Sequence, residues 1–235
     1  MLNDLKAILY FFAIDMRYSF LIFWTIFITS SVFLLVLSYS FSINMVVSVS
    51  VATYIYCGIA GFLQTKITLP YSIKFGFTRS RYVVGNLFFN IFLAITISII
   101  HLVYNYALNG AASFIGADTF SLMTTIEGTT LANTWYNHLL VDVMFCSLTY
   151  SVCLLFGAVF YRLGLVGGLV AIAALVLSIF IPETRNMIID NFVAVNNGDI
   201  RLSIPFIPLI TITLLCSLPV WALLRNATTT PGIAR

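Results

Sequence analysis

Six apolar blocks, each long enough to cross a lipid bilayer, make up most of this chain. A helix needs roughly 20 apolar residues to cross a hydrocarbon core about 30 Å thick. The blocks are continuously apolar rather than alternating, which favours helices over the strands of a membrane barrel. The sequence therefore predicts an all-α integral membrane protein with six transmembrane helices, at residues 20–39, 45–63, 83–108, 139–161, 165–181 and 204–224.

Little of the chain lies outside these blocks. Of the 235 residues, 61% are hydrophobic and only 8% are charged, so no polar stretch is long enough to build a separate soluble domain. We therefore expect residues 1–235 to form a single transmembrane domain.

The gaps between the blocks sort the charged residues. Nine of the eleven Lys and Arg residues fall on the side of the N-terminus, and only Arg185 and Arg201 fall on the other side. Cytoplasmic loops of membrane proteins carry an excess of Lys and Arg, so we expect both termini in the cytoplasm. The net charge of +3 reflects this topology and gives no indication of a nucleic-acid partner.

Residues 1–18 precede the first block and have an amphipathic pattern. Their apolar residues recur at spacings of three and four, at Leu2, Leu5, Leu9, Phe12 and Met16. Such a pattern predicts a helix that lies in the membrane interface with its apolar face toward the acyl chains. The alternative is a simple lead-in to the first transmembrane helix.

The gap at residues 64–82 combines positive charge with aromatic residues. Four basic side chains alternate with aromatic ones between Lys66 and Tyr82, and Pro70 and Gly76 interrupt the segment. Two interpretations fit. The segment is either an ordinary cytoplasmic loop with snorkelling Lys and Arg side chains, or a short helix that docks on a soluble partner.

Two further segments have distinctive composition. Residues 182–205 mix apolar and polar side chains, which predicts a short helix that dips back into the outer leaflet before the last block. In the fifth block, small residues stand four apart, Gly164 with Gly168 and Gly167 with Ala171. This spacing lets helix backbones approach closely, and the partner helix belongs either to this chain or to a second subunit.

Polar residues inside the apolar blocks are the candidates for chemistry. Asn86, Asn90, His101 and Asn105 lie roughly on one face of the third block. Such a stripe must face protein or water, so it either lines a substrate path or holds helices together. His138 and Asp142 are four residues apart at the start of the fourth block, and we expect a structural hydrogen bond there.

Motifs for enzyme chemistry are missing from the sequence. It contains no GxxxxGK[ST] phosphate-binding loop, no GxSxG and no HExxH. His138 and Asp142 supply two ligands, whereas a catalytic zinc takes three from the protein. We expect no enzymatic activity, no metal and no cofactor in this chain.

The segment from Phe75 to Tyr82 reads FGFTRSRY. It is similar to the FG-x-[ST]-R-x-x-[FY] stretch of small bacterial permeases, and the order of segments resembles the permease subunit of an ABC-2-type (type V) ABC transporter. The resemblance implies an exporter in the bacterial plasma membrane that moves an amphipathic peptide, a drug or a lipid-like substrate.

The resemblance also implies partners and sites. A cytoplasmic ATPase subunit would hold ATP and Mg and dock on the first inner loop, through Lys74, Phe75, Gly76, Phe77, Arg79, Arg81 and Tyr82. A second permease copy, identical or not, would pack on the first and fifth helices, the latter through Gly164, Gly167, Gly168 and Ala171.

Two other functional classes fit the same sequence. One is a membrane protein without transport activity, such as an immunity protein or a sensor. The other is an intramembrane enzyme, for which His138 and Asp142 are the only candidate catalytic pair.

Overall fold

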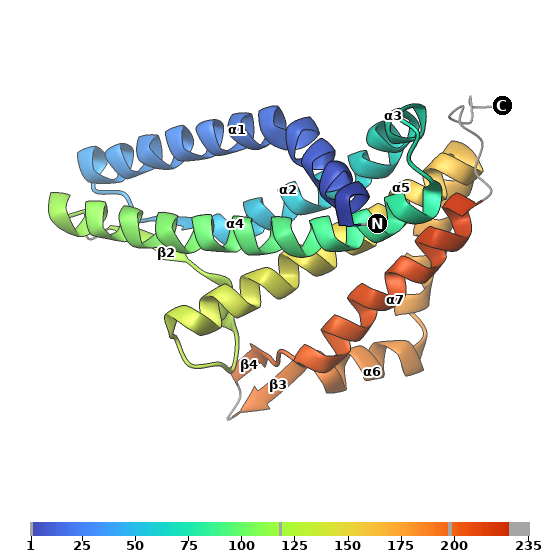
Figure 1. The fold of residues 1–235 in the computed structure, drawn as a ribbon. Coiled ribbons are helices and arrows are strands. Elements are labelled where there is room, and N and C mark those ends of the chain that lie inside the picture. Colours follow the sequence, from blue (N-terminus) through green and yellow to red (C-terminus); the bar gives the residue numbers. More distant parts are fainter. Residues whose placement is uncertain (1, 118, 197–198, 226–235) are drawn as a thin grey trace.

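A computed structural model describes residues 2–117, 119–196 and 199–225, and these residues are mostly helical (Figure 1). The helices are α1 (Leu2–Phe41), α2 (Val49–Leu63), α3 (Leu69–Lys74), α4 (Arg79–Ile115), α5 (Trp135–Ile179), α6 (Pro182–Phe192) and α7 (Phe206–Arg225), with a π-helical segment η1 (Gln64–Thr68) and a 3-10 turn η2 (Thr125–Gly128). Strand β1 (Met45–Ser48) pairs in parallel with β2 (Phe120–Met123), and β3 (Val193–Asn196) pairs antiparallel with β4 (Asp199–Leu202).

Four of the described helices are long and apolar enough to cross a membrane: α1 from Leu5, α4, α5 and α7. The predicted second block is the shorter helix α2, which continues through η1 into α3. The predicted fourth and fifth blocks are both part of α5, which is interrupted at Gly164 (φ 71°, ψ −170°). The chain is thus a helical, membrane-type fold, as the sequence predicts, but its apolar segments are joined differently.

The helical segments run between two ends of the molecule. At one end, Arg79 reaches the end of α7 and Phe11 of α1 contacts Phe75. We call this the basic end, because Lys74, Arg79, Arg162 and Arg225 gather there. At the other end, which we call the strand end, lie both small sheets, η2 and α6, and the backbone of Thr130 bonds to that of Leu202 in β4 (Figure 1).

The predicted interfacial helix is the first part of α1 rather than a separate element. Figure 1 shows α1 bent, with its first turns (dark blue) directed toward α4. Phe12 is fully buried and Ile8 nearly so, and Gly85 of α4 lets Ile8 approach: a Cβ at Gly85 would lie 2.8 Å from the Ile8 side chain. The apolar stripe therefore packs on protein, through Phe12 with Leu5, Leu9 and Met16 partly buried beside it; the Leu2 side chain lies outside the described residues.

The predicted loop at residues 64–82 is largely helical. The chain stays helical through Lys74, with Pro70 in the first turn of α3, and the break comes only at residues 75–78. Gly76 turns the chain there with a positive φ of 88°, a conformation that favours glycine. Thr78 then caps α4 by accepting a hydrogen bond from the Arg81 backbone N–H (3.4 Å).

Residues 182–205 contain the expected short helix, but no residue of α6 is fully buried, and the β3–β4 hairpin follows it. The hairpin and the β1–β2 pair are short strands of four residues each, which the sequence did not predict, in a fold that is otherwise helical. Met45–Ser48, expected as the start of a helix, is strand β1 instead, because its backbone pairs with the distant β2.

Helix α5 lies at the centre of the bundle, against α2, α4 and α7. Glycines let α2 approach it: a Cβ at Gly61 would lie 2.3 Å from the Tyr150 carbonyl oxygen, and one at Gly157 2.8 Å from that of Phe62. Side chains of α2 are therefore held close to those of the first half of α5.

Candidate functional site

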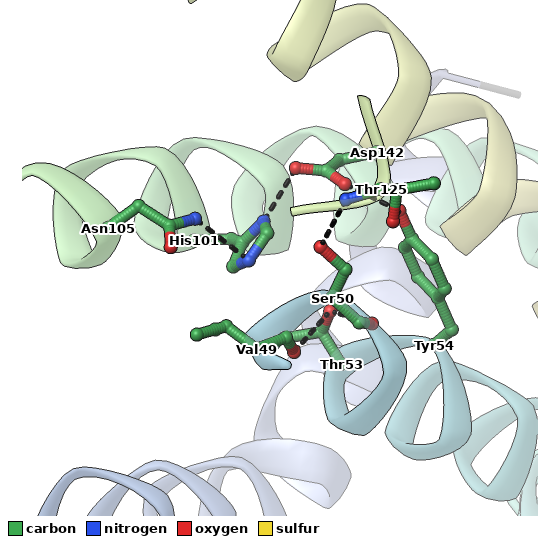
Figure 2. A network of polar contacts seen from close by, with 8 residues as sticks. All are labelled: Val49, Ser50, Thr53, Tyr54, His101, Asn105, Thr125 and Asp142. Carbon is green, nitrogen blue, oxygen red and sulfur yellow. Dashed lines mark hydrogen bonds and ion pairs between the residues drawn. The ribbon is translucent and has the colours of Figure 1, made fainter. Parts of the chain in front are cut away.

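The most concentrated polar cluster in the described residues surrounds Asp142 of α5. Asp142 is only 4% exposed, although it lies within an apolar helix. One carboxylate oxygen accepts a hydrogen bond from the Tyr54 hydroxyl of α2 (2.6 Å), and the other contacts Nδ1 of His101 in α4 (2.5 Å). Three helices therefore converge on one carboxylate, as Figure 2 shows.

The cluster continues in two directions. Along α4, Nε2 of His101 contacts the side-chain nitrogen of Asn105 at 3.0 Å. Toward the strand end, the Tyr54 hydroxyl lies 2.9 Å from the Thr125 hydroxyl. The backbone N–H of Thr125 donates to the Ser50 hydroxyl (3.3 Å), as Figure 2 shows. The turn η2 thus covers the cluster, which we call the Asp142 cluster: Tyr54, His101, Asn105, Thr125 and Asp142.

Local sequence explains how the cluster forms. His101 and Asn105 are four residues apart and so share one face of α4. An ionised side chain among apolar helices must be paired, because removal from water is costly. The close approach of α2 and α5 at Gly61 places Tyr54 within reach of the carboxylate.

A second polar layer lies closer to the basic end. The Tyr150 hydroxyl donates to Asn86 (2.8 Å), and the Asn90 amide donates to the Ser151 hydroxyl (2.8 Å). A cavity of about 10 Å³, room for about one water molecule, lies beside these groups and reaches Ser217 of α7. The Asn90 side-chain oxygen is buried and without a hydrogen-bond partner in the described part of the chain.

The predicted stripe of α4 is therefore buried against α5. Asn86, Asn90, His101 and Asn105 are all at most 8% exposed, and the first three bond to side chains of α5. The contacts of Asn86, Asn90 and His101 join α4 to α5, whereas Asn105 contacts His101 on the same helix.

The expected hydrogen bond between His138 and Asp142 is wrong. His138 Nε2 contacts Asn133 at 2.6 Å, whereas Asp142 is paired with His101 and Tyr54. His138 and Asp142 share a face of α5, but the buried Asp142 carboxylate is paired with side chains of α4 and α2. The sequence does contain a signal for the pairing of His101 with Asp142. Both residues lie inside apolar blocks, where a polar side chain needs a partner.

The predicted partner-docking residues are divided between surface and core. Phe75 is 70% exposed, and Lys74, Gly76 and Arg81 are exposed with it. Tyr82 is fully buried and donates to the Gln64 carbonyl (2.5 Å), while Phe77 packs near Phe11.

The neighbouring cations bind the end of α7. Arg79 donates to the Arg225 carbonyl (2.8 Å), and Arg162 donates to the carbonyls of Ala222 and Leu223 (3.0 and 3.1 Å). These carbonyls lie in the last turn of α7 and lack a partner within the helix.

The glycines of the fifth block fold α5 back on itself. Gly164 has the positive φ that breaks the helix. A Cβ at Gly167 would lie 2.3 Å from Leu163, and one at Gly168 2.3 Å from the Phe160 ring. Gly167 and Gly168 therefore lie against Leu163 and Phe160, which come just before the break. Ala171 lies across a groove of about 450 Å³ from the first half of α5 and from α7.

No described group of three or more His, Cys, Asp and Glu side chains is placed to hold a metal ion. Comparison of the chain with protein-family models, with curated proteins and with solved structures finds no match.

Proposed function

We propose that this chain is the permease subunit of an ATP-driven exporter of the ABC-2 (type V) kind, paired with a separate ATPase subunit. The observation that carries the proposal is the turn between α3 and α4. It presents an exposed aromatic side chain, Phe75, among Lys74 and Arg81 at the end of a helical membrane-type fold. Such a combination suits docking of a soluble partner, since aromatic residues are frequent anchors in interfaces.

The attachment of this turn supports a role in transmitting motion. Phe75 and Phe77 both contact Phe11 of α1, with ring centroids 5.4 and 6.4 Å apart. On the other side, the Trp221 indole of α7 donates to Ser80 (3.3 Å). A displacement of the turn would therefore reach α1, α4 and α7, and the coupling free energy would come from contacts that differ between the two states.

The charge distribution supports a topology for the proposed permease. We place the basic end in the cytoplasm of a bacterial cell and the strand end outside the plasma membrane, because cytoplasmic loops are rich in Lys and Arg. Both termini are then cytoplasmic, and six helical segments cross the bilayer. ATP and Mg would bind the partner ATPase, and this chain would carry no cofactor.

A second permease copy completes the proposed exporter. The second half of α5 and the outer face of α1 expose large apolar side chains, including Val166, Val170 and Phe33. These faces, rather than the partly buried Gly167 and the buried Gly168, would contact the copy. The cargo we propose is an amphipathic peptide, a drug or a lipid-like molecule.

Co-purification with the ABC ATPase encoded beside this chain tests the assignment. We expect Phe75→Ala to weaken the complex at least about thirtyfold, equivalent to about 2 kcal/mol for an interface anchor. Phe114→Ala is the matched control, since Phe114 is 93% exposed and lies in the last turn of α4, at the strand end. If Phe75→Ala combined with Lys74→Glu left both the complex and stimulation of the ATPase intact, the docking role would be wrong. Absence of any such ATPase beside this chain would favour the immunity or sensor alternative.

A further inference from the structure

The contacts of His101 link its protonation state to the orientation of the Asn105 amide. The side-chain nitrogen of Asn105 is a donor only, so the His101 Nε2 that it contacts is an acceptor. A neutral imidazole has one donor and one acceptor nitrogen, so Nδ1 carries the proton and donates it to Asp142. If Asp142 were protonated, it would donate to Nδ1, and the hydrogen of the neutral ring would lie on Nε2. The Nε2–H would then face the Asn105 amide hydrogens, two donors against each other. With the Asn105 nitrogen toward His101, the cluster therefore carries one negative charge, on Asp142.

The same cluster is also prepared for one additional proton. The Asn105 side-chain oxygen is buried without a hydrogen-bond partner among the described residues. Rotation of the amide by half a turn would bring this oxygen to His101 Nε2, where it would accept a hydrogen bond from a protonated ring. Both the neutral and the cationic imidazole would then have a partner at each nitrogen.

Proton uptake changes the charge of the cluster from negative to zero. Nε2 takes a proton from hydronium and releases water, and no electrons move. The resulting imidazolium forms an ion pair with the Asp142 carboxylate, which an apolar environment favours over an isolated buried charge.

The other titratable groups near the cluster lie on α2, α5 and η2. Tyr54 of α2 donates to the carboxylate, and Cys146 of α5 is close enough to interact with it electrostatically. His138 of α5 interacts with Asp142, with His101 and with Glu127 of η2. Glu127 is exposed, and it lies next to Thr125 at the strand end, so that end is the nearest solvent.

We propose that Asp142, His101 and Asn105 form a proton-binding site inside the helix bundle, with the proton held on His101 Nε2 and exchanged at the strand end. The Asn105 amide is the positioning group, because its rotation matches the hydrogen-bond partner to the protonation state. The site does not depend on the exporter assignment.

The histidine content makes a direct test possible, because His101 and His138 are the only two histidines. In the His138→Gln variant, labelled with ¹⁵N-histidine and held in lipid nanodiscs, the only imidazole signals come from His101. We expect them to change with pH from the form with hydrogen on Nδ1 alone to the doubly protonated form. A single protonation state from about pH 4.5 to 9 would overturn the proposal.

Variants at position 105 test the positioning role by the same spectra. Asn105→Leu removes the acceptor for Nε2–H, so protonation should move to lower pH. Asn105→Asp supplies a carboxylate and should move it to higher pH. Asn109→Leu, one turn further along α4 and exposed, is the matched control and should leave the transition in place.

The two variants act in opposite directions, so one of them suffices if the other does not fold, as judged by its elution profile and thermal unfolding. A transition that stays in place in every folded Asn105 variant would overturn the assignment of the amide.

Discussion

The Asp142 cluster and the basic end place charged groups in opposite ways. In the cluster, the carboxylate of Asp142 bonds to side chains of two other helices, at 2.5 and 2.6 Å, and is almost fully buried. At the basic end, Arg79 and Arg162 bond to backbone carbonyls of α7 and remain in reach of solvent.

Solvent explains the difference. Water cannot solvate a charge inside an apolar bundle, so the charged group requires a hydrogen-bonding or oppositely charged side chain at a fixed position. A cation at a helix end has water available and also finds the unpaired carbonyls of the last turn. We therefore expect substitutions in the cluster to affect stability strongly, and substitutions at the basic end to affect it weakly.

The largest effect is expected from Asp142→Ala. The change leaves His101 Nδ1 buried without its partner and leaves the Tyr54 hydroxyl with Thr125 alone, and we expect a loss of about 3 kcal/mol or more. Asp142→Asn keeps a hydrogen-bonding side chain and should cost less. Thermal unfolding in detergent micelles measures both, with Asp190→Ala in exposed α6 as the control. Equal unfolding midpoints for Asp142→Ala and Asp190→Ala would remove the contrast between the two regions.

A smaller loss is expected from Gly61→Ala, which tests whether close packing of α2 on α5 supports the cluster. The new methyl group would lie 2.3 Å from the Tyr150 carbonyl oxygen, which belongs to the backbone and cannot rotate away. We expect a loss of about 1–3 kcal/mol in the same unfolding assay.

Gly110→Ala is the control for this prediction. A Cβ at Gly110 of α4 would meet no atom within 4 Å, and alanine favours a helix over glycine by about 1 kcal/mol. If Gly61→Ala proved as harmless as Gly110→Ala, α2 would not need its close contact with α5.

The sequence predicts those features of the fold that depend on residues close together in the chain. The apolar blocks are helical because hydropathy and helix hydrogen bonding are local properties, and the α4 stripe is buried because polar side chains in apolar helices must face protein. The helix breaks at residues 75–78 because Gly76 has a positive φ there, and the sequence already predicts that Gly76 interrupts this segment.

Pairings between distant segments could not be predicted in this way. His101 and Asp142 are 41 positions apart, and nothing local in the sequence distinguishes His101 from His138 as the partner. The contact of Gly61 with α5 depends on the relative rotation of two helices. Strand β1 is likewise explained only by its pairing with β2, about 75 residues later.

At the basic end, the double change Arg79→Gln and Arg162→Gln should have a modest effect. The double change removes the hydrogen bonds that the two arginines donate to carbonyls of α7. Water can bond to these carbonyls instead, so we expect a loss of about 0.5 kcal/mol for each arginine. Hydrogen–deuterium exchange should rise at the last turn of α7 and stay unchanged around Asp142. A loss as large as that of Asp142→Ala would show that the basic end is as tightly built as the cluster.

The smallest effect on stability is expected from Phe75→Ala. The ring is 70% exposed, and its edge contact with Phe11 is the main interaction that the change removes, so the loss should be about 0.5 kcal/mol. Tyr82→Phe, seven residues later, is the informative comparison, because it deletes the hydroxyl that donates to the buried Gln64 carbonyl. That change should cost about 1 kcal/mol or more. The order of the two unfolding midpoints therefore separates an aromatic ring exposed for a partner from an aromatic ring that holds helices together, although both belong to one short segment. The reverse order would mean that Phe75 serves the fold, and its exposure would then give no support to a docking role.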